Sequence, residues 1–166
     1  MQILNFFKTF WHTNKKTQDK KSEIILSVDH FRYKTSIEIR FKDIDMLGHV
    51  NNATYFTYME VGRTKYWENA IKWDWSKTGV IIGDASIKYF KPIYLKDKLH
   101  MYIRTSRIGN SSFDLEYLLV KIENGAEVIC SSGKTACITY CYSTKKSIPI
   151  PEFEKKKMLA FEQIIG

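Results

Sequence analysis

The 166-residue chain has no run that approaches the ~20 consecutive apolar residues that a helix needs to cross a bilayer. The segment from Met1 to Trp11 is rich in apolar residues, but no basic stretch precedes them and no small-residue cleavage site follows. We therefore expect neither a secretory signal nor an integral membrane segment. We interpret residues 1–30 as an extension, either a short amphipathic helix or a tail, that continues into a lysine-rich linker.

Cysteine is also scarce, with only Cys130, Cys137 and Cys141. An odd number of cysteines without a secretion signal favours reduced, buried thiols and a cytoplasmic location. A metal site would need more ligands at a tighter spacing than these three cysteines provide. We therefore expect no metal and no other cofactor.

Acidic residues are fewer than basic ones, 18 Asp and Glu against 26 Lys and Arg, which gives a net charge of +8. A solvated lysine-rich surface, a site for a polyanionic small molecule and a nucleic-acid site would each explain this excess. The basic residues are spread along the chain and form no nucleic-acid motif, so we expect no nucleic-acid partner.

The apolar pattern predicts an α+β domain. Residues 35–41 alternate as a half-buried strand, and residues 53–71 have apolar side chains at helical spacing on nearly all sides, which is typical of a largely buried helix. Four more strands follow, joined by short links such as Asn124-Gly125, which indicates an antiparallel meander. The predicted strands are 80–90, 98–108, 112–122 and 127–142. A C-terminal helix or tail occupies residues 152–166.

The most distinctive segment is the strand-to-helix turn Asp43-Ile-Asp-Met-Leu-Gly-His-Val-Asn-Asn52. It holds two carboxylates, a glycine, a histidine and two asparagines at a helix N-terminus. Free N–H groups and the positive end of the helix dipole attract negative charge there. A carboxylate at such a position could act on a carbonyl compound.

Together with Tyr55, Phe56 and Glu60, this turn resembles that of hotdog-fold acyl-CoA thioesterases of the hydroxybenzoyl-CoA thioesterase type. The resemblance extends to Ala85–Ile93, Lys96–Leu99 and Ile108–Ser112. It implies a hotdog fold over residues 31–151, in which an antiparallel sheet of about five strands wraps around one long buried helix. It also implies a homodimer or homotetramer with sites at the subunit interface.

The resemblance places the catalytic carboxylate at Asp45, as a general base or as a nucleophile, and the sequence leaves this choice open. Backbone N–H groups from His49 to Asn52 would stabilise the oxyanion, with the family's polarising amide nearest Asn52. His49 assists catalysis or builds the turn; both interpretations have similar weight.

Five residues are candidates for substrate binding, and each has a plain structural alternative. Gly48 allows close approach of the thioester or only a turn with positive φ. Asn51 positions substrate or caps the helix. Tyr55 lines an acyl pocket or packs in the core. Glu60 is a reserve catalytic carboxylate or the partner of Arg63, and Ser112 begins a strand near the pocket or belongs to a hairpin turn.

The resemblance thus implies a thioester hydrolase that converts an acyl-CoA into free acid and CoA. An acyl-ACP thioesterase is the alternative within enzymes, because an acidic carrier protein would also suit the basic chain. A hotdog hydratase and a non-catalytic acyl-CoA-binding protein are less favoured alternatives.

Overall fold

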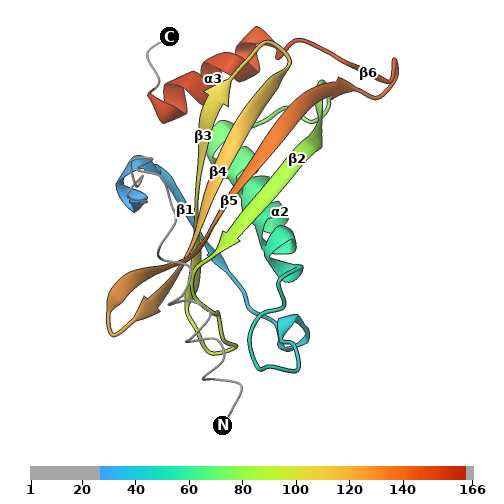
Figure 1. Ribbon diagram of the computed structural model, residues 1–166. Coiled ribbons are helices and arrows are strands. Elements are labelled where there is room, and N and C mark those ends of the chain that lie inside the picture. Colours follow the sequence, from blue (N-terminus) through green and yellow to red (C-terminus); the bar gives the residue numbers. More distant parts are fainter. Residues whose placement is uncertain (1–26, 164–166) are drawn as a thin grey trace, which may run out of the picture.

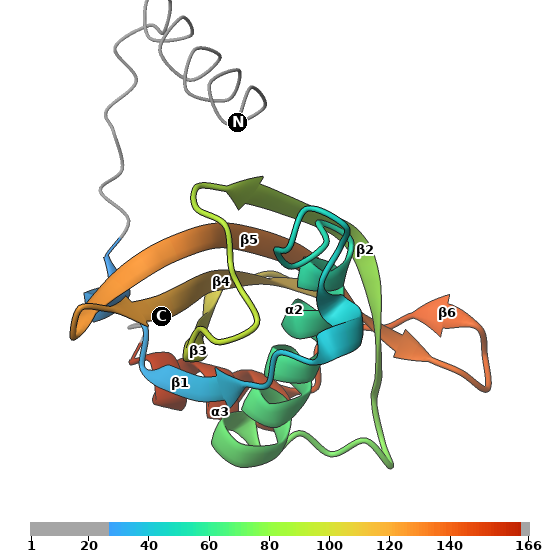
Figure 2. The same ribbon diagram turned by 90° about the horizontal axis from the view of Figure 1, so that it is seen from below.

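The computed structural model describes residues 27–163, so our interpretation of residues 1–26 lies outside the described part. A curved antiparallel sheet wraps around a long helix (Figures 1 and 2). The elements are a 3-10 turn (Val28–His30), β1 (Tyr33–Ile37), a second 3-10 turn (Phe41–Asp43), α2 (Thr54–Tyr66) with a π-helical end (Trp67–Ile71), β2 (Gly79–Tyr89), β3 (Leu99–Ile108), β4 (Ser112–Glu123), β5 (Ala126–Cys141), β6 (Lys146–Ser147) and α3 (Glu152–Glu162).

The first strand is shorter than the predicted range 35–41, because it ends at Ile37. Its expected buried residue Phe41 is instead 84% exposed and begins a 3-10 turn. The backbone turns there because the Asp43 carboxylate accepts hydrogen bonds from both the main chain and the side chain of Arg40. This local capping interaction ends the alternating pattern.

The sheet order is β1-β3-β4-β5-β2, with β6 paired to β5. The strands β2 to β5 lie within one residue of their predicted bounds at each end. The predicted meander, in which consecutive strands are neighbours, is wrong for β2. This strand pairs with β5 at the far edge and not with β3. The link 90–98 crosses the end of the sheet, a distance of about 14 Å for three strand spacings that nine extended residues cover easily.

The core lies between α2 and the concave face of the sheet. Tyr58, Met59 and Tyr66 of α2 are buried against side chains of β3, β4 and β5. The opposite side of α2 is open, since Phe56 and Val61 are exposed. The expected helix at 53–71 is therefore present, but a single chain buries only one of its faces.

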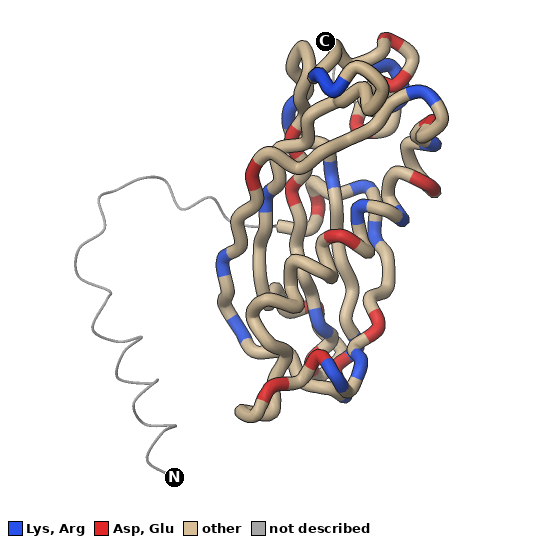
Figure 3. The backbone as a smooth tube through the Cα atoms, turned by 90° about the vertical axis from the view of Figure 1, so that its right-hand side faces the viewer, with Lys and Arg blue, Asp and Glu red and all other residues tan. Residues whose placement is uncertain are grey.

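The helix α3 closes one end of this core, and charged side chains lie along the strands. α3 packs across the end of the sheet through buried Met158, and Glu162 accepts a hydrogen bond from Tyr66. Lys and Arg are interspersed with Asp and Glu along the strands (Figure 3). Several of them pair on neighbouring strands, for example Arg104 with Glu116.

Candidate active site

The turn between β1 and α2 is closed by its own backbone. The Asp45 N–H donates to the His49 carbonyl at 2.9 Å, and the Gly48 N–H donates to the Asp45 carbonyl at 3.0 Å. Gly48 has φ +82°, a conformation that glycine adopts without steric cost. The link after β2 supports the turn, because the buried residue Ile93 accepts a hydrogen bond from the Val50 N–H at 2.8 Å.

Asp43 is a structural carboxylate. It is 3% exposed and accepts hydrogen bonds from the Arg40 guanidinium, the Arg40 N–H and the Tyr58 hydroxyl. Burial by itself would raise the pKa of Asp43, but these hydrogen bonds outweigh burial and lower it. Its own backbone carbonyl accepts the Asn51 N–H at 2.9 Å, so Asp43 holds both sides of the turn together.

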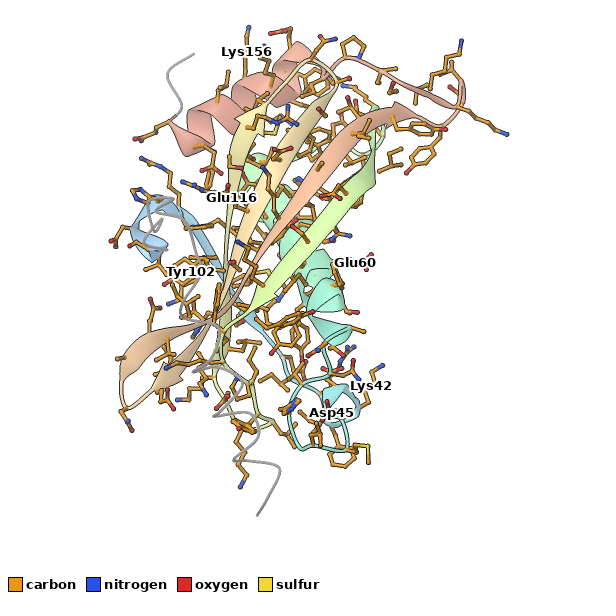
Figure 4. All side chains as sticks on the ribbon, in the orientation of Figure 1. Lys42, Asp45, Glu60, Tyr102, Glu116 and Lys156 are labelled. Carbon is orange, nitrogen blue, oxygen red and sulfur yellow. The ribbon has the colours of Figure 1, made fainter. Side chains whose placement is uncertain are left out.

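Asp45 differs from Asp43 because it faces solvent. Its side chain is 21% exposed, and one oxygen accepts the Leu47 N–H at 2.8 Å. The other oxygen lies 3.4 Å from Nδ1 of His49. Figure 4 shows Asp45 at the end of the molecule where α2 begins. A carboxylate with one anchored oxygen and one oxygen beside an imidazole can take a proton from water or attack a carbonyl.

The predicted oxyanion donors are reduced to two by the structure. The N–H groups of Val50 and Asn51 already donate to the carbonyls of Ile93 and Asp43. Within residues 27–163, the N–H groups of His49 and Asn52 have no protein acceptor. These two amides are therefore the ones that a thioester oxygen could use.

Asn51 and Tyr55 both make contacts within the protein. The Asn51 side chain accepts the Ala53 N–H at 2.9 Å and so stabilises the turn just before α2. Tyr55 is buried with its ring edge-on to Tyr89 at a centroid distance of 4.9 Å. The Tyr89 hydroxyl donates to the Asn52 carbonyl at 3.0 Å, so this aromatic pair connects β2 to the turn.

A cleft of about 250 Å³ opens between α2 and β2. The Glu60 side chain lies at this cleft, 67% exposed, with one oxygen 4.0 Å from the Arg63 guanidinium. Glu60 lies further along α2 than the turn that carries Asp45 (Figure 4). The lining residues are Phe56, Thr57, Met59, Glu60, Arg63, Ile82, Ala85 and Thr135.

The structure does not bring Ser112 to the turn within one chain. Ser112 begins β4 beside α3, at the other end of the sheet, where its Oγ accepts from Arg107. Asp45, Gly48, His49, Asn51, Asn52 and Tyr55 do come together.

Sequence reasoning missed three residues that matter here: Tyr58, Ile93 and Arg63. Tyr58 belonged to the apolar pattern of the predicted helix, Ile93 lay in the link after a predicted strand, and Arg63 was considered only as a partner of Glu60. Nothing in the local sequence shows that Ile93 meets the turn, because that contact requires the crossing of the sheet. The sequence did show one useful signal, a basic residue, Arg63, three residues after Glu60 on a largely apolar helix.

The sequence matches the family profile of the thioesterase-like superfamily over residues 39–158. The chain belongs to the thioesterase-like superfamily. This confirms the expected hotdog thioesterase fold and its class of chemistry, the hydrolysis of thioesters. Among the residues described, no helix is long and apolar enough to cross a membrane, and no cluster of His, Cys, Asp and Glu could hold a metal ion.

Similar proteins within this superfamily support the assignment. The uncharacterized protein YsmA of Bacillus subtilis is 27% identical over 78% of this chain and 86% of its own length. The long-chain acyl-CoA thioesterase FadM of Escherichia coli is 24% identical over 75% of this chain and 95% of its own. A thioesterase from Thermus thermophilus, solved with coenzyme A and Zn, is 29% identical over 82% of this chain and 98% of its own, with a TM-score of 0.71.

Proposed function

We propose that this protein hydrolyses an acyl-CoA at the turn before α2, with Asp45 as the catalytic carboxylate. The observation that supports this most strongly is a partly exposed Asp45 carboxylate in the same turn as the unpaired N–H groups of His49 and Asn52. The similarity to FadM and to a thioesterase that binds coenzyme A supports the carrier.

In the proposed reaction, the thioester carbonyl oxygen accepts a hydrogen bond from the Asn52 N–H at the start of α2. Asp45 removes a proton from water as the water oxygen attacks the carbonyl carbon, and His49 helps to orient the carboxylate. The carbon–sulfur bond then breaks, and the CoA thiolate takes up the proton. Alternatively, Asp45 attacks the carbonyl carbon, the carbon–sulfur bond breaks to release the CoA thiolate, and water hydrolyses the resulting anhydride.

The test measures thiol release from a panel of acyl-CoA esters by the wild type, Asp45→Asn and Glu60→Gln. We expect Asp45→Asn to lose about 10²–10⁴-fold in kcat, the usual contribution of a general base, and far more than Glu60→Gln. A larger loss in Glu60→Gln would move the catalytic carboxylate to α2. If the wild type hydrolysed no acyl-CoA and no acyl-ACP, the thioesterase proposal would be refuted and a non-catalytic acyl-binding role would be favoured.

A single turnover in ¹⁸O-labelled water tests for nucleophilic attack by Asp45. Direct attack by water puts the label only in the released acid. If Asp45 attacks and water then opens the anhydride at the Asp45 carbonyl carbon, the label enters Asp45 and the acid leaves with an unlabelled Asp45 oxygen, so label found in Asp45 would demonstrate the anhydride.

The acyl-ACP alternative rests on the net charge of +8, because acyl carrier proteins are acidic. Comparing kcat/KM for the same acyl group on CoA and on ACP, at low and at high salt, distinguishes the two carriers. A preference for ACP that disappears at high salt would favour this second function.

We further propose that the working unit is a homodimer paired through β2. This edge strand has eleven residues and exposes apolar side chains, which is a template for pairing with another strand. We expect sedimentation to give a dimer and Ile81→Lys, a charge placed on the exposed edge, to shift it toward monomer. A wild type that stays monomeric at micromolar concentration would refute this pairing.

A cytoplasmic location is also part of the proposal. Cys130, Cys137 and Cys141 are all free, as expected in a reducing compartment. Cell fractionation with a detection tag tests it, and recovery in the membrane or secreted fraction would contradict it.

A further inference from the structure

The cleft between α2 and β2 has apolar walls and a charged far end. Phe56 and Met59 of α2 and Ile82 and Ala85 of β2 line its sides. Arg63 lies nine residues beyond Thr54, the first residue of α2, which is about 14 Å along the helix at ~1.5 Å per residue. An acyl chain whose thioester meets the Asn52 N–H would therefore run past these apolar side chains toward Arg63.

Arg63 has no close carboxylate partner. Its side chain is 15% exposed, and the nearest carboxylate oxygen in the described chain, on Glu60, lies 4.0 Å away. Glu60 extends into solvent, so screening weakens the pair. A half-buried guanidinium can form close, bidentate hydrogen bonds with an oxyanion, and Glu60 does not supply them.

The cleft floor next to Arg63 is polar as well. The hydroxyls of Tyr117 and Thr135 lie 2.8 Å apart on β4 and β5, and Thr135 lines the cleft. The Arg63 guanidinium is close enough to the Tyr117 hydroxyl to oppose the rise in its pKa that burial causes. The Arg63 guanidinium and the Thr135 hydroxyl therefore line the cleft together with apolar side chains, which is typical of a site that selects a polar group on an apolar ligand.

We propose that Arg63 is a specificity-determining residue that binds a carboxylate at the far end of the acyl group, so that the preferred substrates are CoA thioesters of dicarboxylic acids. The ligand carboxylate accepts two hydrogen bonds from the Arg63 guanidinium, which Glu60 does not use, and the Glu60 side chain extends into solvent. The position of Arg63 along α2 sets the preferred length of the acyl chain. The terminal carboxylate must reach Arg63 while the thioester remains at the turn. This inference rests on the proposed thioesterase activity.

The experiment compares kcat/KM for pairs of CoA thioesters that are matched in length: adipoyl with hexanoyl, suberoyl with octanoyl, sebacoyl with decanoyl, and dodecanedioyl with dodecanoyl. We expect the wild type to prefer the carboxylated member of at least one pair by about tenfold or more, the effect of one hydrogen bond to a charged group. Arg63→Met should abolish this preference while still hydrolysing the uncharged member.

Two further variants separate recognition from folding. Glu60→Gln removes the competing carboxylate from an exposed position and should increase the preference for the carboxylated member. Lys65→Met removes a cation two residues away that contacts the Ser36 carbonyl outside the cleft, and it should leave the preference unchanged. If Arg63→Met fails to fold, Arg63→Lys keeps the charge without the planar fork and should reduce the preference.

Several results would overturn the inference. A wild type that hydrolyses the uncharged member of every pair at least as well would do so. An Arg63→Met variant that slows both members equally would show a structural role only. Faster hydrolysis of length-matched ω-hydroxyacyl thioesters would assign the site to a neutral group instead. A wild type that hydrolyses none of the thioesters would refute the thioesterase activity itself, which is a different result from equal rates within each pair.

Discussion

The hydrogen bond between Tyr58 and Asp43 gives a sharp test of how the turn is held. Tyr58→Phe removes only the hydroxyl, which donates to the Asp43 carboxylate at 2.9 Å, and both residues are buried. A hydrogen bond to a charged group contributes about 1.5–3 kcal/mol. Arg40 still holds the carboxylate in the variant, so we expect a loss of about 2 kcal/mol in the free energy of unfolding.

For a chain of this size, each kcal/mol shifts the melting temperature by about 2–4 °C, so the variant should melt about 4–8 °C lower. Urea unfolding at neutral pH and differential scanning calorimetry measure both quantities. Tyr55→Phe is the matched control, because it removes the same group from the same helix, and the Tyr55 hydroxyl makes no hydrogen bond within residues 27–163.

The difference between wild type and Tyr58→Phe should also depend on pH. Because the pKa of Asp43 is lowered in the folded protein, the stabilisation from its carboxylate is present above the unfolded pKa and is lost as pH falls through the folded pKa. The difference should narrow in the same acidic range. Equal losses in Tyr58→Phe and Tyr55→Phe, or a difference that does not change with pH, would refute this reasoning.

Two other substitutions test the contacts of α2. Gly62→Ala would place a Cβ against the Sδ of buried Met101. Overpacking costs about 1–3 kcal/mol and the better helix propensity of alanine returns about 1 kcal/mol, so we expect the free energy of unfolding to fall by up to about 2 kcal/mol. A stabilised variant would contradict the close packing. Partial burial raises the pKa of Glu162, so wild-type stability relative to Glu162→Gln should fall as pH rises from the unfolded pKa through the folded pKa of this group. Urea unfolding of both proteins across that range checks this, and a constant difference would show that Glu162 does not titrate differently in the folded state.

Much of the fold could be predicted because its signals are local. Alternating residues located β3, β4 and β5 to within one residue at each end, and the Asn124-Gly125 turn joins β4 to β5 as predicted. β1 was predicted less well, because Arg40 and Asp43 form a capping interaction that the alternating pattern does not reveal. The position of β2 beside β5 could not be predicted either, because pairing across the sheet depends on which edge a link reaches.

The sequence by itself determined which residues form the turn and that Asp45 stands before a helix N-terminus, because those relationships lie within ten residues. The resemblance pointed to Asp45, but only the tertiary structure showed how the surroundings of Asp43 and Asp45 differ. One carboxylate is buried under Arg40 and Tyr58, and the other is left beside His49 and open to solvent. The tertiary structure also decided which amides stay unpaired, since Val50 is satisfied by Ile93, a residue more than forty positions away. The burial of Asp43 and the hydrogen bonds from Tyr58 to Asp43 and from Val50 to Ile93 arise only when distant segments pack together.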